Sequence, residues 1–199
     1  MNSQAIALYK KRRSQYALGR ELPIGRDEAT QLIKHAVREA PSAFNAQSSR
    51  SLILHGAHSV KFWGLAKDAL RRIVPADAFA ATEAKLDSFA AGAGTVLFFV
   101  DSTVVQGLQE KFPLYADNFP VWGEQSNGMA QFAVWTALAD AGIGASLQHY
   151  NPLVDEAVRH EWGIPESWTL RAQMPFGSHQ GGFGEKAYID DDARFKVFA

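Results

Sequence analysis

The sequence contains no cysteine among its 199 residues. Disulfides, thiolate nucleophiles, iron–sulfur clusters and cysteine-based zinc sites are therefore excluded. The absence of cysteine fits a reducing compartment. Any redox chemistry would have to come from a bound cofactor.

An excess of charge of one sign is also lacking, because 20 lysine and arginine residues face 21 acidic residues. This balance offers no general attraction to nucleic acid or to an anionic membrane. Residues 1–13 lack the apolar core of a signal peptide, and no stretch approaches the ~20 apolar residues of a membrane span. We therefore expect a cytoplasmic protein with neither nucleic acid nor a membrane as its partner.

Several common catalytic motifs are missing. Gly142-Ile143-Gly144 follows a predicted helix and has no third glycine, so a Rossmann site is poorly supported. The sequence has no Walker phosphate loop, no HExxH and no GxSxG motif. His55 and His58 have no carboxylate at ligand spacing, and we expect no metal site.

The apolar pattern predicts an irregular mixture of helices and strands in one domain over residues 1–199. Helices are expected over 3–11, 62–72 and 77–90, in a segment capped by Asp27 and stopped by Pro41, and in a short segment closed by Gly163. Strands are expected over 51–55, as a short buried strand, and over 95–100 and 169–174. This order contains no regular βαβ units.

The most apolar predicted helix covers residues 125–141 and has little polar face. Such a helix is buried nearly all round. One subunit of this size supplies too little cover for it, which favours a second subunit, although burial within the chain is the alternative. The chain ends with Phe195, Val197 and Phe198, apolar residues that would suit a partner surface.

Two polar segments in the first quarter of the chain are candidate ligand sites. Residues 12–16, RRSQY, offer two guanidinium groups suited to a phosphate beside a hydroxyl suited to a sugar-like chain, with ordinary surface charge as the alternative. Residues 41–50, PSAFNAQSSR, offer donors and acceptors to the edge of a flat heterocycle. An ordinary turn after a helix would also explain the second segment.

Two further polar segments lie later in the chain. Residues 145–152 directly follow the apolar helix, so their polar side chains need partners, either a bound ring system or one another. Residues 173–177, QMPFG, precede a glycine-rich loop and Lys186. This lysine is either a further phosphate cation or simply faces solvent.

Together these segments resemble the nitroreductase family, more narrowly its short branch of copper-induced and fatty-acid-repression nitroreductases. A long stretch, FPVWGEQSNGMAQFAVWTALADAGIGASLQHYNP, strengthens the resemblance, which spans nearly the whole chain. It implies an α+β fold with a central, mostly antiparallel sheet surrounded by helices. It also implies an intertwined homodimer in which both subunits line each of two FMN sites.

The resemblance assigns roles to individual residues. The FMN phosphate would be bound by Arg12, Arg13 and Lys186, the ribityl chain by Ser14, and the pyrimidine side of the flavin by the loop of Ser42, Asn45 and Gln47. The segment Gln148, His149 and Tyr150 would pass the flavin N5 edge, where a backbone N–H is required. The chain departs from the family at Lys186-Ala187-Tyr188, which lacks a second cation, and at the acidic run of residues 190–192.

The implied activity is reduction of nitroaromatics or quinones by NADH or NADPH through FMN. Both substrates would use one flavin face, which predicts ping-pong kinetics. Phe44, Phe119 and Trp122 are candidate walls for a flat acceptor, with core packing as the alternative. Arg50 is a candidate cation for the charge that gathers on the reduced flavin, and no catalytic acid or base is required.

Two other functions fit the same sequence. One is a flavin-binding sensor or regulatory protein with little turnover. The other is a different reaction on the same fold, such as dehalogenation or flavin fragmentation, because a fold does not fix the chemistry.

Overall fold

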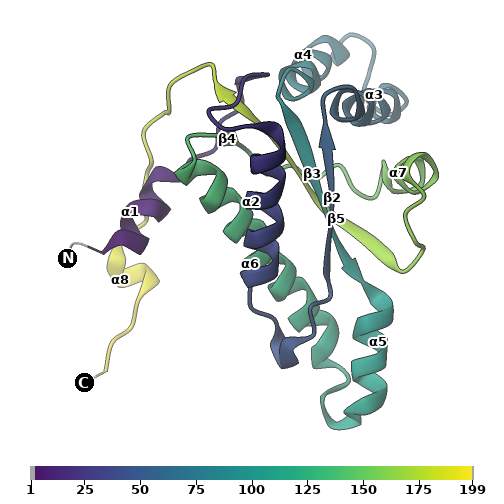
Figure 1. Ribbon diagram of the computed structural model, residues 1–199, viewed down its shortest axis with the longest axis vertical. Helices are drawn as coiled ribbons and strands as arrows, with labels where there is room; N and C mark the ends of the chain where they lie inside the picture. The colour runs from purple at the N-terminus through teal and green to yellow at the C-terminus, as the bar shows by residue number, and fades with distance from the viewer. Residues whose placement is uncertain (1–2, 199) are drawn as a thin grey trace.

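The computed structural model describes residues 3–198 and places a five-stranded sheet between two layers of helices (Figure 1). The strands are β1 (Leu18–Gly19), β2 (Ser49–His55), β3 (Gly94–Asp101), β4 (Gly144–Ala145) and β5 (Trp168–His179). Their order is β1-β5-β3-β2, with β4 also on β5, and every pair is antiparallel. Residues 1, 2 and 199, the ends of the predicted domain, lie outside the described residues.

Helices cover both faces of the sheet. The helices of the described residues are α1 (Gln4–Lys11), α2 (Arg26–Glu39), α3 (Ala57–Arg71), α4 (Phe79–Ala90), α5 (Ser102–Lys111), α6 (Asn118–Asp140), α7 (Asp155–Trp162) and α8 (Asp191–Arg194), with the short 3-10 turns η1 (Ala43–Asn45) and η2 (Pro113–Tyr115). Figure 1 shows α2 and α6 on one face, and α3, α4 and α7 on the other. The predicted α+β fold with an antiparallel sheet surrounded by helices is confirmed.

The central strand β3 connects two apolar cores because its side chains alternate between the two faces. Val96 and Phe98 pack with α2 and α6, whereas Leu97 and Phe99 pack with α3, α4 and α7. All eight residues of β3 are buried. Burial of one such side chain contributes about 1.5–3 kcal/mol, so this strand is the main anchor of the layers.

Two strands differ from the sequence prediction. Strand β2 is an edge strand in which only Leu54 is buried, because β3 is its one neighbour in the sheet. Strand β5 continues beyond the predicted residue 174, through Pro175 and Gly177. Gly177 allows β1 to approach, since a Cβ atom there would lie 2.1 Å from the carbonyl oxygen of Gly19. A proline and a glycine that suggested a loop thus lie inside a strand.

The starts of two helices also differ from prediction. The N-cap of α2 is Gly25, and Asp27 lies in the first turn without a side-chain capping bond. Its carboxylate still stabilises the helix, because a negative charge in the first turn interacts favourably with the helix dipole. Helix α3 begins at Ala57, five residues before the predicted start. The predicted closing residue of α7 is confirmed, because Gly163 follows the helix in the left-handed conformation with φ 63°.

The long helix α6 is buried on one face only within a single chain. Ala130, Val134 and Leu138 face the sheet, whereas Met129 is 40% exposed and Phe132 is 41% exposed. The alternative of burial within one chain is therefore wrong, and cover of this face by a second subunit stays a prediction. The exposed face, together with α1 and α2, lines an apolar groove of about 770 Å³.

Two kinds of feature are absent from residues 3–198. None of the helices in this range is both long enough and apolar enough to cross a membrane. Within the same range, no three histidine or carboxylate side chains are grouped so that they could hold a metal ion.

Candidate active site

The first and third predicted segments meet at the C-terminal end of α6. Ser14 forms a parallel bridge with Ala145, and the Gln15 N–H donates to the Ala145 carbonyl over 2.9 Å. The Lys11 ammonium group donates to the Asp140 carbonyl over 2.7 Å, which holds α1 against the end of α6. Residues 12–16 and 145 are therefore neighbours although they are far apart in the sequence.

Arg12 and Arg13 lie beside this junction, and within residues 3–198 neither has a negatively charged partner. The Arg12 guanidinium carbon is 4.3 Å from the centre of the Trp135 ring, and Arg13 donates to the Gly184 carbonyl over 2.6 Å. In the described part of the chain, neither arginine forms an ion pair with a carboxylate. Burial, and then the charge of Arg13, lowers the pKa of Arg12 below its ordinary value. An anionic group such as a phosphate would stabilise this arrangement.

Lys186 lies on the exposed tail that follows β5. It is two residues beyond Gly184, the residue that Arg13 contacts, and its ammonium nitrogen is 4.9 Å from the centre of the Tyr188 ring. The acidic run begins α8, where the Asp190 carboxylate accepts a hydrogen bond from the Asp192 N–H over 2.9 Å. The predicted third cation thus lies exposed on the tail, two residues beyond the carbonyl that Arg13 contacts.

The third and fourth segments meet at one edge of β5. Gln148 and Gln173 exchange backbone hydrogen bonds of 2.7 and 2.9 Å. The Tyr150 N–H donates to the Gln173 side-chain oxygen over 2.6 Å, and the Gln173 amide donates to the Asn151 side-chain oxygen over 3.2 Å. Between these bonds, the His149 N–H finds no acceptor within residues 3–198. The His149 N–H is therefore an unused backbone donor in this segment.

The second segment forms a tight, strained loop around η1. The Gln47 N–H donates to the Ser42 hydroxyl over 2.9 Å, and the Asn45 N–H donates to the Ser42 carbonyl over 2.9 Å. Phe44, Asn45 and Gln47 adopt left-handed φ angles of 56°, 51° and 50°. Such angles are costly for residues other than glycine and are concentrated at functional sites. The side chains of Asn45 and Gln47 are exposed, and Gln47 lines a hollow of about 410 Å³.

An aromatic cluster lies under this loop and contains the three predicted acceptor-wall residues. The Phe44 ring centre is 5.3 Å from that of Phe119 and 5.9 Å from that of Trp122. Phe44 is 52% exposed, whereas Phe119 is 2% exposed and supports it from below. Phe112 and Tyr115 complete the cluster. Sequence reasoning missed these two because they flank Pro113 and resemble ordinary loop residues.

We expect Phe44→Gly to be more stable than Phe44→Ala by about 0.5–1 kcal/mol. Both variants lose the ring packing, but only glycine removes the cost of the left-handed backbone conformation. Urea unfolding midpoints measure the difference. Ala43→Gly is the matched control at a neighbouring position without a positive φ, and it should be destabilising. A more stable alanine variant at position 44 would contradict the strain.

Arg50 connects the loop to the start of α5. Its guanidinium group pairs with the Asp101 carboxylate at 3.0 Å and donates to the carbonyls of Gln47 and Ser49. Asp101 also caps α5 by accepting a hydrogen bond from the Thr103 N–H over 3.1 Å. Asp101 therefore offsets much of the Arg50 charge, and the pair fixes the loop. Sequence reasoning missed Asp101, although an aspartate between a strand and a helix is a usual N-cap signal.

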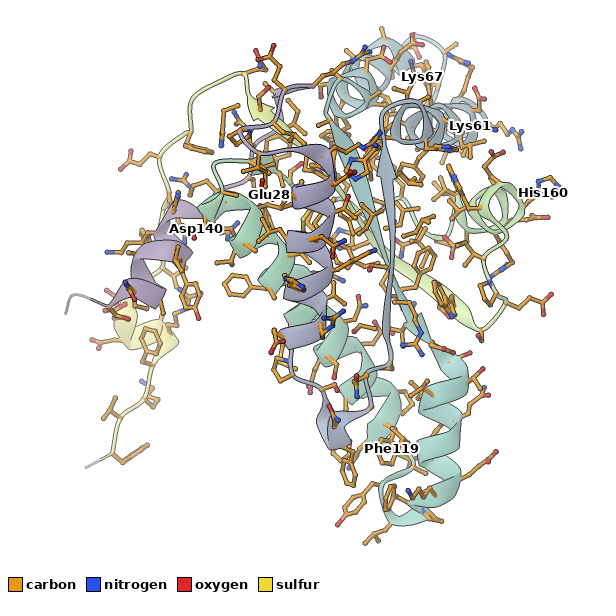
Figure 2. All side chains as sticks on the ribbon, in the orientation of Figure 1. Glu28, Lys61, Lys67, Phe119, Asp140 and His160 are labelled. Atoms are coloured by element: carbon orange, nitrogen blue, oxygen red, sulfur yellow. The ribbon has the colours of Figure 1, made fainter. Side chains whose placement is uncertain are left out.

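Within one chain, the loop of residues 41–50 and the arginine segment lie at opposite ends of α6. The loop packs on Phe119, near the start of the helix, and Arg12 follows Lys11, which binds Asp140 at its end. Figure 2 labels Phe119 and Asp140 far apart along this helix. Their 21 helical steps correspond to about 32 Å. A single mononucleotide cannot contact both groups in the same chain.

The layered antiparallel sheet, and two arginines at the end of α6 that form no ion pair within the described residues, define an α+β protein suited to a phosphate-bearing ligand. Residues 9–178 match the nitroreductase family. HBN1 of Saccharomyces cerevisiae is 38% identical to this chain over 194 residues, covering 94% of this chain and 96% of HBN1. This chain belongs to the nitroreductase family and is an oxidoreductase, as its sequence segments predict.

Solved structures agree with this assignment. Nitroreductase CinD from Lactococcus lactis in complex with chloramphenicol matches 98% of this chain and all of its own, with 49% identity and a TM-score of 0.91. A nitroreductase with bound FMN from Desulfitobacterium hafniense matches both chains fully with a TM-score of 0.73. Its identity of 15% supports the fold alone.

Proposed function

We propose that this protein is an FMN-dependent oxidoreductase that uses NADH or NADPH to reduce nitroaromatics or quinones. The observation that carries the proposal is the pair of cations at Arg12 and Arg13, which have no counter-charge among the described residues. They lie in residues 12–16, in which Ser14 forms a bridge with Ala145. Ala145 is a few residues before His149, whose N–H has no acceptor within residues 3–198. When bound, FMN supplies the redox chemistry, taking a hydride from the nicotinamide and passing electrons to the acceptor.

The chain's own residues hold and orient this cofactor. Arg12, Arg13 and Lys186 bind the phosphate through charge-assisted hydrogen bonds, and Ser14 contacts the ribityl chain. Gln148 and Tyr150 keep the adjoining segment in place, so that the His149 N–H donates at the N5 edge of the flavin. No side chain is needed to transfer a proton, because positioning is the protein's main contribution.

A second copy of the chain completes each site. The loop with Ser42, Asn45 and Gln47 is too far from Arg12 to serve the same cofactor within one chain, so the partner supplies it. The exposed apolar face of α6 supports this arrangement, because large exposed apolar surfaces are typical of protein–protein contacts. We propose an intertwined homodimer with two equivalent sites.

The acceptor is a small planar molecule. CinD has been solved in complex with 4-nitrophenol as well as with chloramphenicol. In this chain, the exposed Phe44 ring lies nearly parallel to Trp122, with an interplanar angle of 19°. Buried Phe119 supports both rings. This surface, carried to the cofactor of the partner subunit, would stack on a flat acceptor.

The purified protein should be yellow, release FMN on denaturation, and lose its visible flavin absorbance when NADH or NADPH is added. A nitroaromatic or a quinone should restore the colour. Double-reciprocal plots at several acceptor concentrations should be parallel, because the nicotinamide must leave before the acceptor enters. Intersecting lines would contradict one shared site.

The same experiment separates the enzyme from a flavin-binding sensor. A sensor would bind FMN but stay oxidised for minutes after addition of a nicotinamide donor. Protein that takes up no FMN at all would overturn both interpretations.

A further inference from the structure

Gln173 is a polar side chain in the middle of a buried strand. It lies in β5, is 0% exposed, and its backbone is opposite Leu97 of the central strand β3. A carboxamide in such a place is costly unless its oxygen and its nitrogen are both hydrogen-bonded. Both are bonded here, and both partners, Tyr150 and Asn151, belong to the segment that follows β4.

The side chain of Gln173 continues a backbone ladder that would otherwise end. Gln148 forms an isolated antiparallel bridge with Gln173, and no strand pairing continues beyond it in the described residues. In a regular ladder, the Tyr150 N–H would find its acceptor on the β5 backbone. Here the carboxamide oxygen of Gln173 accepts that bond at 2.6 Å. One residue therefore holds Gln148 through its backbone and Tyr150 through its side chain.

These hydrogen bonds from Gln148 and Tyr150 to Gln173 fix the orientation of His149, which lies between them. In extended backbone, neighbouring residues face opposite sides. Because Gln148 and Tyr150 both donate toward Gln173, the His149 N–H faces away from β5. The His149 side chain is exposed, so the segment borders open space where a ligand can approach.

We propose that Gln173 is a positioning residue for the flavin, holding the His149 N–H where it can donate to the N5 edge. The inference rests on the proposed function, since it assigns the support of a donor within that same site. Gln173 does not contact the cofactor. It acts through the backbone of residues 148–150.

Three variants test the role. Gln173→Met removes the acceptor of the Tyr150 N–H at similar side-chain length. Gln173→Glu keeps an oxygen for the Tyr150 N–H. Burial favours the neutral form of this carboxyl group, whose O–H can donate to the Asn151 side-chain oxygen as the Gln173 amide does. Gln131→Met is the matched control, because it removes a hydrogen-bonded amide of the same type elsewhere, which is partly buried and donates to the Asn127 side-chain oxygen on α6.

The FMN dissociation constant, measured by quenching of flavin fluorescence, should rise about tenfold in Gln173→Met, as expected for a lost buried hydrogen bond. It should stay within about threefold of wild type in Gln173→Glu and Gln131→Met. In the apoprotein, exchange of the Tyr150 amide hydrogen should be faster in Gln173→Met alone. If the loss of any buried or partly buried amide weakened FMN binding, the FMN dissociation constant of Gln131→Met would rise as well.

Amide exchange in the wild-type protein provides a test that does not depend on variant folding. Addition of FMN should slow exchange at His149 and leave the already bonded Tyr150 unchanged. Wild-type protein that binds FMN without protecting the His149 amide would overturn the inference, as would a Gln173→Met variant with wild-type FMN affinity. Wild-type protein that binds no FMN would instead overturn the proposed function.

Discussion

Phe132→Glu is expected to produce a colourless monomer. Phe132 lies on the exposed face of α6, with its ring centre 5.2 Å from that of Tyr9, in the apolar groove between α1, α2 and α6. A stable dimer would bury this groove, and an unpaired carboxylate buried there costs several kcal/mol. If each cofactor needs residues from two copies, the monomer should lose at least about 100-fold in FMN affinity. Light scattering and visible absorbance measure the two effects.

Ile73→Glu is the matched control for this experiment. Ile73 is 59% exposed and follows α3 in the opposite helical layer, away from the groove. The same change from an apolar residue to a glutamate there should leave both the dimer and the flavin in place. A Phe132→Glu protein that is monomeric and still yellow would show that one chain holds the cofactor by itself.

Local sequence patterns predict a helix or strand when its own residues reflect how it is buried in the fold. The run from Val96 to Phe99 is apolar because both faces of β3 are covered, and both sequence and structure show that strand. The end of β5 was missed because Pro175 and Gly177 usually interrupt strands. Only the approach of β1 to within contact of Gly177 explains the glycine, and this approach depends on the tertiary fold.

The residue types of the candidate site can be predicted from the sequence. Most of the contacts that hold these residues in place cannot. A pair of arginines and a polar loop are visible as motifs, and the resemblance to nitroreductases assigned them to one cofactor. The support of Arg12 by Trp135, and of the His149 segment by Gln173, depends on residues that the fold brings together. Trp135 had the spacing of a helix core residue, so its pattern gave no sign of a cation partner.

Arg12→Ala/Arg13→Ala is expected to raise the FMN dissociation constant about 1000-fold, because charge-assisted hydrogen bonds contribute about 1.5–3 kcal/mol each. The two guanidinium groups have no other anionic partner in the described residues, so their loss should not disturb an existing ion pair. Arg72→Ala/Lys85→Ala removes the same charge from exposed positions of the outer helical layer and should bind FMN normally. Fluorescence titration measures all three proteins. An unchanged dissociation constant in the first variant would place the phosphate elsewhere.

Mixing this variant with a loop variant tests whether each site is shared between two chains. Asn45→Gly/Gln47→Gly removes the loop side chains and tolerates their left-handed backbone. Each variant alone should bind little FMN. In a mixed dimer, one site would combine the intact arginines of one chain with the intact loop of the other. Random pairing makes about half of the dimers mixed, so the mixture should recover about one quarter of the wild-type flavin. If one chain supplied both groups, every chain would carry a defect and mixing would restore no flavin.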